Sequence, residues 1–198
     1  MFGQYLHRQL QFLYGWTSDL DIQSFLTPHT SSSASSSVLF RQNQEDVEIS
    51  IVLRPKLFSL ARRNNIPSMH LADFCELVEE ISHFTYLTFC LQRQKRVSLL
   101  DLELQGEIDK YLLSSQGFAS EKQLFERIFE RSAYRQGMSI PMLHRYQLAN
   151  HLGGKFIRKM GLHHGRGGFS SSLLQKLRWF YRRPSLEKWA HIEKTENL

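Results

Sequence analysis

Cysteine is scarce in this sequence of 198 residues, which contains only Cys75 and Cys90. Both fall in a segment whose apolar spacing predicts one helix, and fifteen helical residues would separate them by roughly 22 Å. That separation excludes a disulfide between them, because the Cα atoms of bridged cysteines lie less than about 7 Å apart. We therefore expect two buried, reduced thiols and a reducing, cytoplasmic setting.

Long apolar stretches are also missing, which excludes a helical membrane span. No run of 18 apolar residues occurs in the chain, whereas a transmembrane helix needs about 20. The N-terminal stretch is rich in apolar side chains, but His7, Arg8, Gln9 and Gln11 interrupt it. Because a signal peptide needs an uninterrupted apolar centre, we do not expect one here.

Familiar catalytic motifs are absent as well. The chain contains no Gly-x-Ser-x-Gly nucleophile motif, no His-Glu-x-x-His zinc motif and no glycine-rich dinucleotide fingerprint. Both cysteines fall in a largely apolar helical pattern, which is a poor environment for a nucleophile. The sequence thus identifies no enzyme, and we expect a non-catalytic protein without a cofactor.

What the sequence does contain is a series of helical patterns. Apolar residues recur at helical spacing from Phe2 onward through most of the chain. Helix starts are indicated by Pro55, Ser68, Ser98, Ser120 and Pro141. The fold class we expect is mostly α (α+β), a compact helical domain of about six or seven helices with a small N-terminal β-hairpin.

The hairpin is predicted from one short region that breaks the helical pattern. Val47, Ile49, Ile51 and Leu53 alternate with other residues, which predicts a strand over 46–53 with 38–41 as its partner. The serine-rich tract before it can bury nothing and should be flexible. We therefore divide the chain into an N-terminal helical segment (1–30), a flexible linker (31–37) and one mainly helical domain (38–198).

Charge is sorted along the chain. Residues 131–198 carry thirteen Lys and Arg against three Asp and Glu, whereas residues 69–130 carry six against eleven. The basic C-terminal third therefore either packs against the acidic middle or faces an acidic partner.

The sharpest basic feature is the segment 172–184, which predicts an amphipathic helix. One face is apolar, while Trp179 falls within the basic face beside Arg178 and Arg182. An indole among guanidinium groups suits stacking on nucleotide bases, anchoring to an acidic protein, or insertion at a membrane surface. In the alternative interpretation, Trp179 packs under the next helix and the arginines pair with Glu103, Glu107 or Glu126.

From this helix we infer a binding or adaptor protein that engages an acidic partner through its C-terminal surface. We favour nucleic acid slightly over an acidic protein, and a membrane surface comes third. In a further interpretation, the protein is a subunit of a larger assembly and its basic C-terminal third is buried at an interface.

The glycine-rich loop 161–170 is interpreted as a flexible connector, with contact to a phosphate as the alternative. The predicted binding residues are Lys155, Arg158, Lys159, Arg166, Lys176, Arg178, Trp179, Arg182 and Arg183.

The acidic middle offers a competing hypothesis. Glu80 and His83 form a Glu-x-x-His, a spacing that places carboxylate and imidazole side by side in metal-binding helical bundles. Only one such motif occurs, although a full dinuclear site needs two. We therefore weigh three interpretations: a solvated helix face, a structural network in which His83 or a C-terminal Arg pairs with Glu107, and a metal or acid–base site. The candidate metal ligands are Glu76, Glu80, His83, Glu103 and Glu107.

Overall fold

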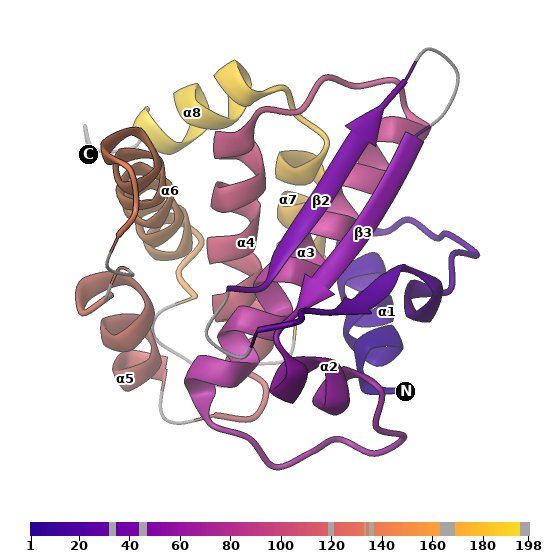
Figure 1. Cartoon of the computed structure of the whole chain (residues 1–198). Coiled ribbons are helices and arrows are strands. Elements are labelled where there is room, and N and C mark those ends of the chain that lie inside the picture. Colours follow the sequence, from indigo (N-terminus) through magenta and orange to yellow (C-terminus); the bar gives the residue numbers. More distant parts are fainter. Residues whose placement is uncertain are drawn as a thin grey trace.

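The computed structural model describes residues 1–31, 35–43, 47–118, 121–132, 134, 137–162 and 169–194. In these ranges the chain forms eight α-helices and a small three-stranded sheet near the N-terminal side (Figure 1). The expected fold class, mostly α with a small β part, is confirmed. No helix within the described ranges has both the length and the apolar character needed to cross a membrane.

The first helix, α1 (Phe2–Tyr14), forms because its apolar residues return at helical spacing and bury one face. Leu6, Leu10 and Leu13 are almost fully buried in the core. The helix ends at Gly15, whose φ of 62° is the left-handed conformation that favours glycine. A short 3₁₀ helix, Ile22–Phe25, follows and is capped by the side chain of Asp21.

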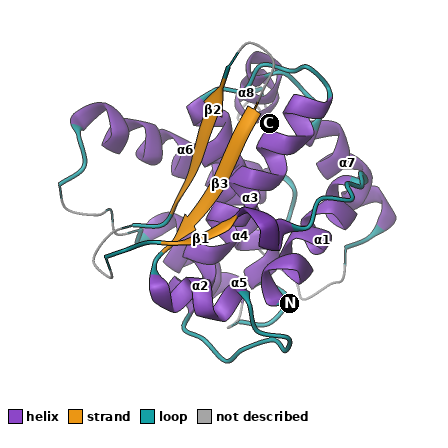
Figure 2. Ribbon diagram, turned by 45° about the vertical axis from the view of Figure 1, so that its right-hand side comes forward, coloured by secondary structure: helices purple, strands orange, loops and turns teal. Residues whose placement is uncertain are grey.

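The sheet contains β1 (Leu26–Pro28), β2 (Ser37–Gln42) and β3 (Val47–Leu53), in the order β1-β3-β2. Strands β2 and β3 pair antiparallel with Val38 opposite Ile51, so the predicted hairpin is confirmed. Strand β1 pairs parallel with β3 and was not predicted. Figure 2 shows the three strands lying together across the helical layer.

The remaining helices follow in order after the sheet. They are α2 (Pro55–Ala61), α3 (Leu71–Gln92), α4 (Leu99–Ser114), α5 (Glu121–Phe125), α6 (Ile140–Lys159), α7 (Ser171–Tyr181) and α8 (Ser185–Glu193), with a π-helical turn at Glu126–Glu130 after α5. Helix α4 starts at the predicted position, where Ser98 and Asp101 form a capping box with Ser98 Oγ accepting from Asp101 N at 3.1 Å. Each cysteine lies on α3 as a free thiol.

Helix α3 is central to the architecture, because it packs against α1, α4 and the sheet (Figure 1). Helix α4 in turn packs against α6, so α3 and α4 are covered on several sides. As a consequence, Glu80, His83, Glu103 and Glu107 are each less than 9% exposed. The interpretation of these residues as a solvated helix face is therefore wrong.

Candidate functional site

The predicted amphipathic helix is α7, and it begins where Ser170 Oγ accepts a hydrogen bond from Leu173 N at 3.2 Å. Its apolar face is buried through Leu177, Phe180 and Tyr181. The Tyr181 ring stacks on Tyr14 of α1 with 3.8 Å between the ring centroids. This packing fixes the rotation of α7, so its basic face points outward.

The outward face of α7 forms a surface groove of about 480 Å³, which we call the α7 groove. Trp179 is 39% exposed there, and the guanidinium of Arg183 lies 4.6 Å from its ring centroid. The indole also lies beside the imidazole of His191 of α8, with 4.9 Å between the ring centroids. The described residues that line the groove include three arginines and no carboxylate: Ser171, Gln175, Arg178, Trp179, Arg182 and Arg183.

Two of the groove arginines also hold the end of α1. Arg178 donates to the carbonyl oxygens of Phe12 and Leu13 at 3.1 and 3.3 Å. Arg182 donates to the carbonyl oxygens of Tyr14 and Gly15 at 3.2 and 3.0 Å. Carbonyl groups at a helix C-terminus have no partner within the helix and carry partial negative charge, so cations stabilise them.

The interpretation that the α7 arginines pair with Glu103, Glu107 or Glu126 is wrong, because other cations pair with these carboxylates. Arg131 lies 3.6 Å from Glu126. Arg145 of α6 lies 3.3 Å from Glu103, and Lys110 lies 2.7 Å from Glu107. The third groove arginine, Arg183, pairs with Glu187 on its own C-terminal side at 3.2 Å. The acidic middle of the chain therefore does not neutralise the α7 groove.

The predicted cations outside α7 contact other parts of the protein and not the α7 groove. Lys155 pairs with Glu193 at 3.3 Å, and Arg158 pairs with Glu130 at 2.9 Å. Lys159 donates to the carbonyl oxygen of His191. These α6 side chains do not line the α7 groove. Arg166 lies outside the described residues, and Lys176 is exposed on α7 itself.

The structure adds a cation that sequence reasoning missed. Lys95, in the loop between α3 and α4, donates to the carbonyl oxygen of Arg182 and so lies at the C-terminal end of α7. Arg93 of the same loop is exposed and has its guanidinium 4.1 Å from the Phe89 ring centroid. Three cations occur within 93–96 and could have indicated this basic loop. The surplus of acidic residues over 69–130 as a whole conceals them.

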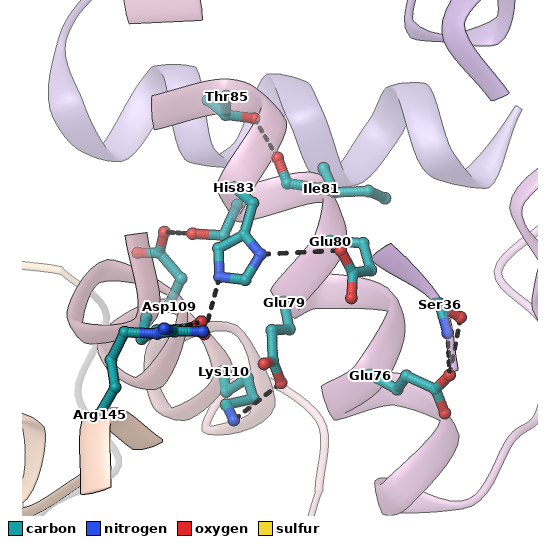
Figure 3. Close-up of polar contacts among 12 residues, drawn as sticks. Ser36, Glu76, Glu79, Glu80, Ile81, His83, Thr85, Asp109, Lys110 and Arg145 are labelled. Atoms are coloured by element: carbon teal, nitrogen blue, oxygen red, sulfur yellow. Dashed lines mark hydrogen bonds and ion pairs between the residues drawn. The ribbon is translucent and has the colours of Figure 1, made fainter. Parts of the chain in front are cut away.

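A second polar site lies between α3 and α4, and we call it the acidic cluster: Glu79, Glu80, His83, Glu103 and Glu107. The imidazole of His83 stands between two carboxylates, with Nδ1 3.6 Å from Glu80 Oε2 and Nε2 3.5 Å from Glu103 Oε2. Figure 3 shows the ring of His83 directed toward Glu80 on one side, with Arg145 alongside. Glu79 is on the same helix, four residues before His83, and it was not predicted.

Cations and an amide border the acidic cluster. Lys110 reaches Glu79 at 3.0 Å as well as Glu107. Asn150 of α6 donates to Glu107 at 3.1 Å. The predicted structural network thus exists with different partners: Glu107 pairs with Lys110 and Asn150, while His83 faces Glu80 and Glu103.

Burial and neighbouring charges act in opposite directions on these groups. Burial disfavours the charged imidazolium, but Glu103 and Glu80 raise the pKa of His83 to about 10. Burial also raises the pKa of the Glu80 and Glu107 carboxyls. Burial acts to raise the pKa of Glu79 too, but Lys110 and His83 more than offset this and hold it below its ordinary value.

Glu76 belongs to a different group of charges. Its carboxylate accepts from Arg54 at 2.8 Å and from Ser36 Oγ at 2.7 Å. Figure 3 shows Glu76 directed toward Ser36 and away from His83. The five predicted metal candidates are therefore not brought together as one set, and Glu79 takes the position beside His83 that Glu76 does not reach.

The acidic cluster borders a cavity of about 740 Å³. Its lining residues include Glu79, Glu80, Glu107 and Lys110 but neither His83 nor Glu103. Two glycines allow the helices to approach here. A Cβ on Gly106 of α4 would lie 3.1 Å from His83 Nε2, and one on Gly153 of α6 would lie 3.1 Å from the Cβ of Glu107.

No family model, no curated protein and no solved structure matches this chain. Its function is therefore argued from the two sites described above.

Proposed function

We propose that the protein is a non-catalytic binding protein that holds single-stranded nucleic acid in the α7 groove. The observation that carries the proposal is the composition of this groove: three arginines and an exposed indole, with no carboxylate among its described lining residues. Cations attract phosphates and release counterions on binding. Among the described residues, Arg178 and Arg182 contact backbone carbonyl groups and no carboxylate, and Arg183 pairs only with the exposed Glu187.

The groove residues divide into two roles. Arg183, and Lys176 on α7 just outside the groove lining, contact phosphates, because their charged groups are not engaged with α1. Arg183 exchanges its exposed partner Glu187 for a phosphate when nucleic acid binds. Arg178 and Arg182 fix the end of α1 and add positive potential through guanidinium groups that keep their charge. Trp179 offers its partly exposed ring to a base, which takes the place of the Arg183 guanidinium over the ring as Arg183 moves to a phosphate. Such stacking contributes about 1–3 kcal/mol per base.

Nucleic acid is favoured over an acidic protein because the groove combines cations with a flat aromatic surface. Bases present faces to an indole while their phosphates remain within reach of neighbouring arginines. A cytoplasmic location is part of the proposal, and the two free cysteines support it.

The proposal is tested by fluorescence anisotropy with a labelled oligothymidylate of about 15 nucleotides. We expect the logarithm of the affinity to fall linearly with the logarithm of salt concentration, by roughly 0.7 for each phosphate contact. We also expect the oligonucleotide to quench tryptophan fluorescence in the wild type and not in Trp179→Phe, because Trp16 is buried and Trp189 is half-buried.

Two double variants distinguish binding in the α7 groove from a general effect of the protein's net charge. Lys176→Glu with Arg183→Glu should abolish binding and leave the fold intact, because neither side chain holds α1. Arg62→Glu with Arg63→Glu changes net charge equally at exposed positions after α2, and should retain most of the affinity. Equal affinity of the two double variants would overturn the proposal. Binding of polyglutamate without binding of the oligonucleotide would assign the groove to an acidic protein instead.

A further inference from the structure

Three buried polar atoms of the acidic cluster make no hydrogen bond among the described residues: Glu80 Oε2, His83 Nε2 and Glu103 Oε2. Each belongs to a residue that is less than 9% exposed, and the side chains of Glu80 and Glu103 are more than nine-tenths buried. His83 Nε2 and Glu103 Oε2 face each other at 3.5 Å without forming a hydrogen bond. Buried polar atoms are normally satisfied, so an unsatisfied group of three at one point needs an explanation.

The charges of the acidic cluster also do not balance. Four carboxylates, those of Glu79, Glu80, Glu103 and Glu107, meet two permanent cations, Lys110 and Arg145. A protonated His83 leaves one excess negative charge in the cluster. When a metal ion displaces that proton, two excess negative charges remain in a buried place. Uncompensated buried charge is strongly unfavourable, so the cluster must take up either protons or a cation.

We propose that Glu79, His83 and Glu103 bind one divalent transition-metal ion. Each offers one ligand atom, and these three atoms lie within 4.8 Å of one another. A divalent ion that displaces the His83 proton matches the two negative charges that then remain, and it gives the unsatisfied His83 and Glu103 atoms a partner. The inference is independent of nucleic-acid binding, because none of these residues lines the α7 groove.

The donor set decides the class of metal. One imidazole with two carboxylates suits Zn²⁺, Mn²⁺ or Fe²⁺, whereas Ca²⁺ and Mg²⁺ prefer oxygen ligands alone. The ion would reach the site from the cavity that Glu79 lines. Arg145 and Lys110 contact the ligand carboxylates Glu103 and Glu79, which orients those ligands from outside.

A single ion is expected, in contrast to the dinuclear site for which the sequence supplied only half of the motifs. Glu80 faces the other nitrogen of His83, Nδ1, at 3.6 Å. A carboxylate in this position accepts the second N–H of a metal-bound histidine and fixes its tautomer. Glu80 is thus a positioning residue in this arrangement, although the sequence presented it as a ligand.

The experiment uses the full chain produced without a histidine tag and stripped with EDTA. Equilibrium dialysis against Zn²⁺, Mn²⁺ and Co²⁺, followed by elemental analysis, should give one ion per chain. X-ray absorption of the Zn²⁺-loaded wild type should show a shell containing both imidazole and carboxylate donors. Absence of uptake, or a shell without imidazole, would overturn the proposal without any variant.

Conservative variants then locate the ion. Glu103→Gln and His83→Gln should each weaken binding at least tenfold. Glu76→Gln is the matched control, because Glu76 lies on the same helix and lines the same cavity but pairs with Arg54. It should bind metal as the wild type does. Unchanged affinity in both Glu103→Gln and His83→Gln would place the ion elsewhere and refute the assignment.

Discussion

The guanidinium group of Arg178 lies directly against Gly15, although 163 residues separate the two in sequence. A Cβ built on Gly15 would come within 2.6 Å of Arg178 Nε, and φ of Gly15 is 62°. Two requirements therefore converge on this position: a left-handed backbone that ends α1, and room for the arginine that contacts its carbonyl groups.

Gly15→Ala should accordingly destabilise the protein by about 2–3 kcal/mol, because left-handed strain and the displacement of Arg178 add together. Urea unfolding measures the change. Gly161→Ala is the matched control, since φ of Gly161 is 67° and a Cβ there meets nothing within 4 Å among the described residues. An equal loss in both variants would show that the Arg178 contact contributes nothing.

Gly106→Ala should lower stability, against the normal trend. In an open helix, alanine in place of glycine gains about 1 kcal/mol. Here the added Cβ lies 3.1 Å from His83 Nε2, so the buried imidazole must move. Gly154→Ala on α6 should be tolerated, because its nearest neighbours are at 3.4 Å, an ordinary contact distance. Thermal unfolding of the two variants gives the comparison, and higher stability of Gly106→Ala would contradict it.

His7 should make the protein sensitive to acid. Burial, with a smaller effect of Arg8, lowers the pKa of His7 from 6.5 to about 4. Its ring contacts Thr85 Oγ1 at 2.9 Å and Gln11 Nε2 at 3.0 Å. The unfolded chain therefore gains a proton at higher pH than the folded protein does, and stability should fall between pH 6.5 and 4 by about 3 kcal/mol. Urea unfolding across this range should show a weaker pH dependence for His7→Gln.

Lys188 should make the stability of the folded protein depend on pH in the alkaline range. Its side chain is fully buried, Nζ donates to Tyr86 Oη at 2.8 Å, and burial lowers its pKa from 10.5 to about 8. Because the folded state holds this proton less tightly than the unfolded chain does, its contribution to stability should rise between pH 8 and 10.5. Lys188→Met should be more stable than the wild type at pH 7 by about 1–2 kcal/mol.

The difference between Lys188→Met and the wild type should shrink as the pH rises from 8 to 10.5, because the folded protein has lost the Lys188 proton and the unfolded chain holds it less and less. Chemical denaturation at several pH values tests this trend. A stability difference that is independent of pH would show that the amine does not titrate in the folded protein.

Local signals in the sequence were sufficient for most of the fold. Alternation at Val47, Ile49 and Ile51 identified β3, and the Ser98–Asp101 capping box identified the start of α4. The apolar face of α7 was also visible in the spacing of Leu177, Phe180 and Tyr181. Each signal depends on neighbours within a few residues, so no tertiary information was needed.

The acidic cluster was misjudged because its burial depends on distant elements. A helical wheel assigns one buried face to α3, but α4 covers the face that carries Glu80 and His83. The cations that border it, Lys110 and Arg145, come from two other helices. Likewise β1 has only three residues and pairs parallel with β3, a contact that no local pattern indicates.

The contact of Arg178 with α1 also bears on how the molecule is made. The carbonyl oxygen of Leu13 and its arginine partner are 165 residues apart. During translation α1 leaves the ribosome long before Arg178 has been synthesised, so the carbonyl groups at its end stay hydrated until α7 has emerged. Contacts over such sequence distances slow folding, so the contact between α7 and α1 forms late.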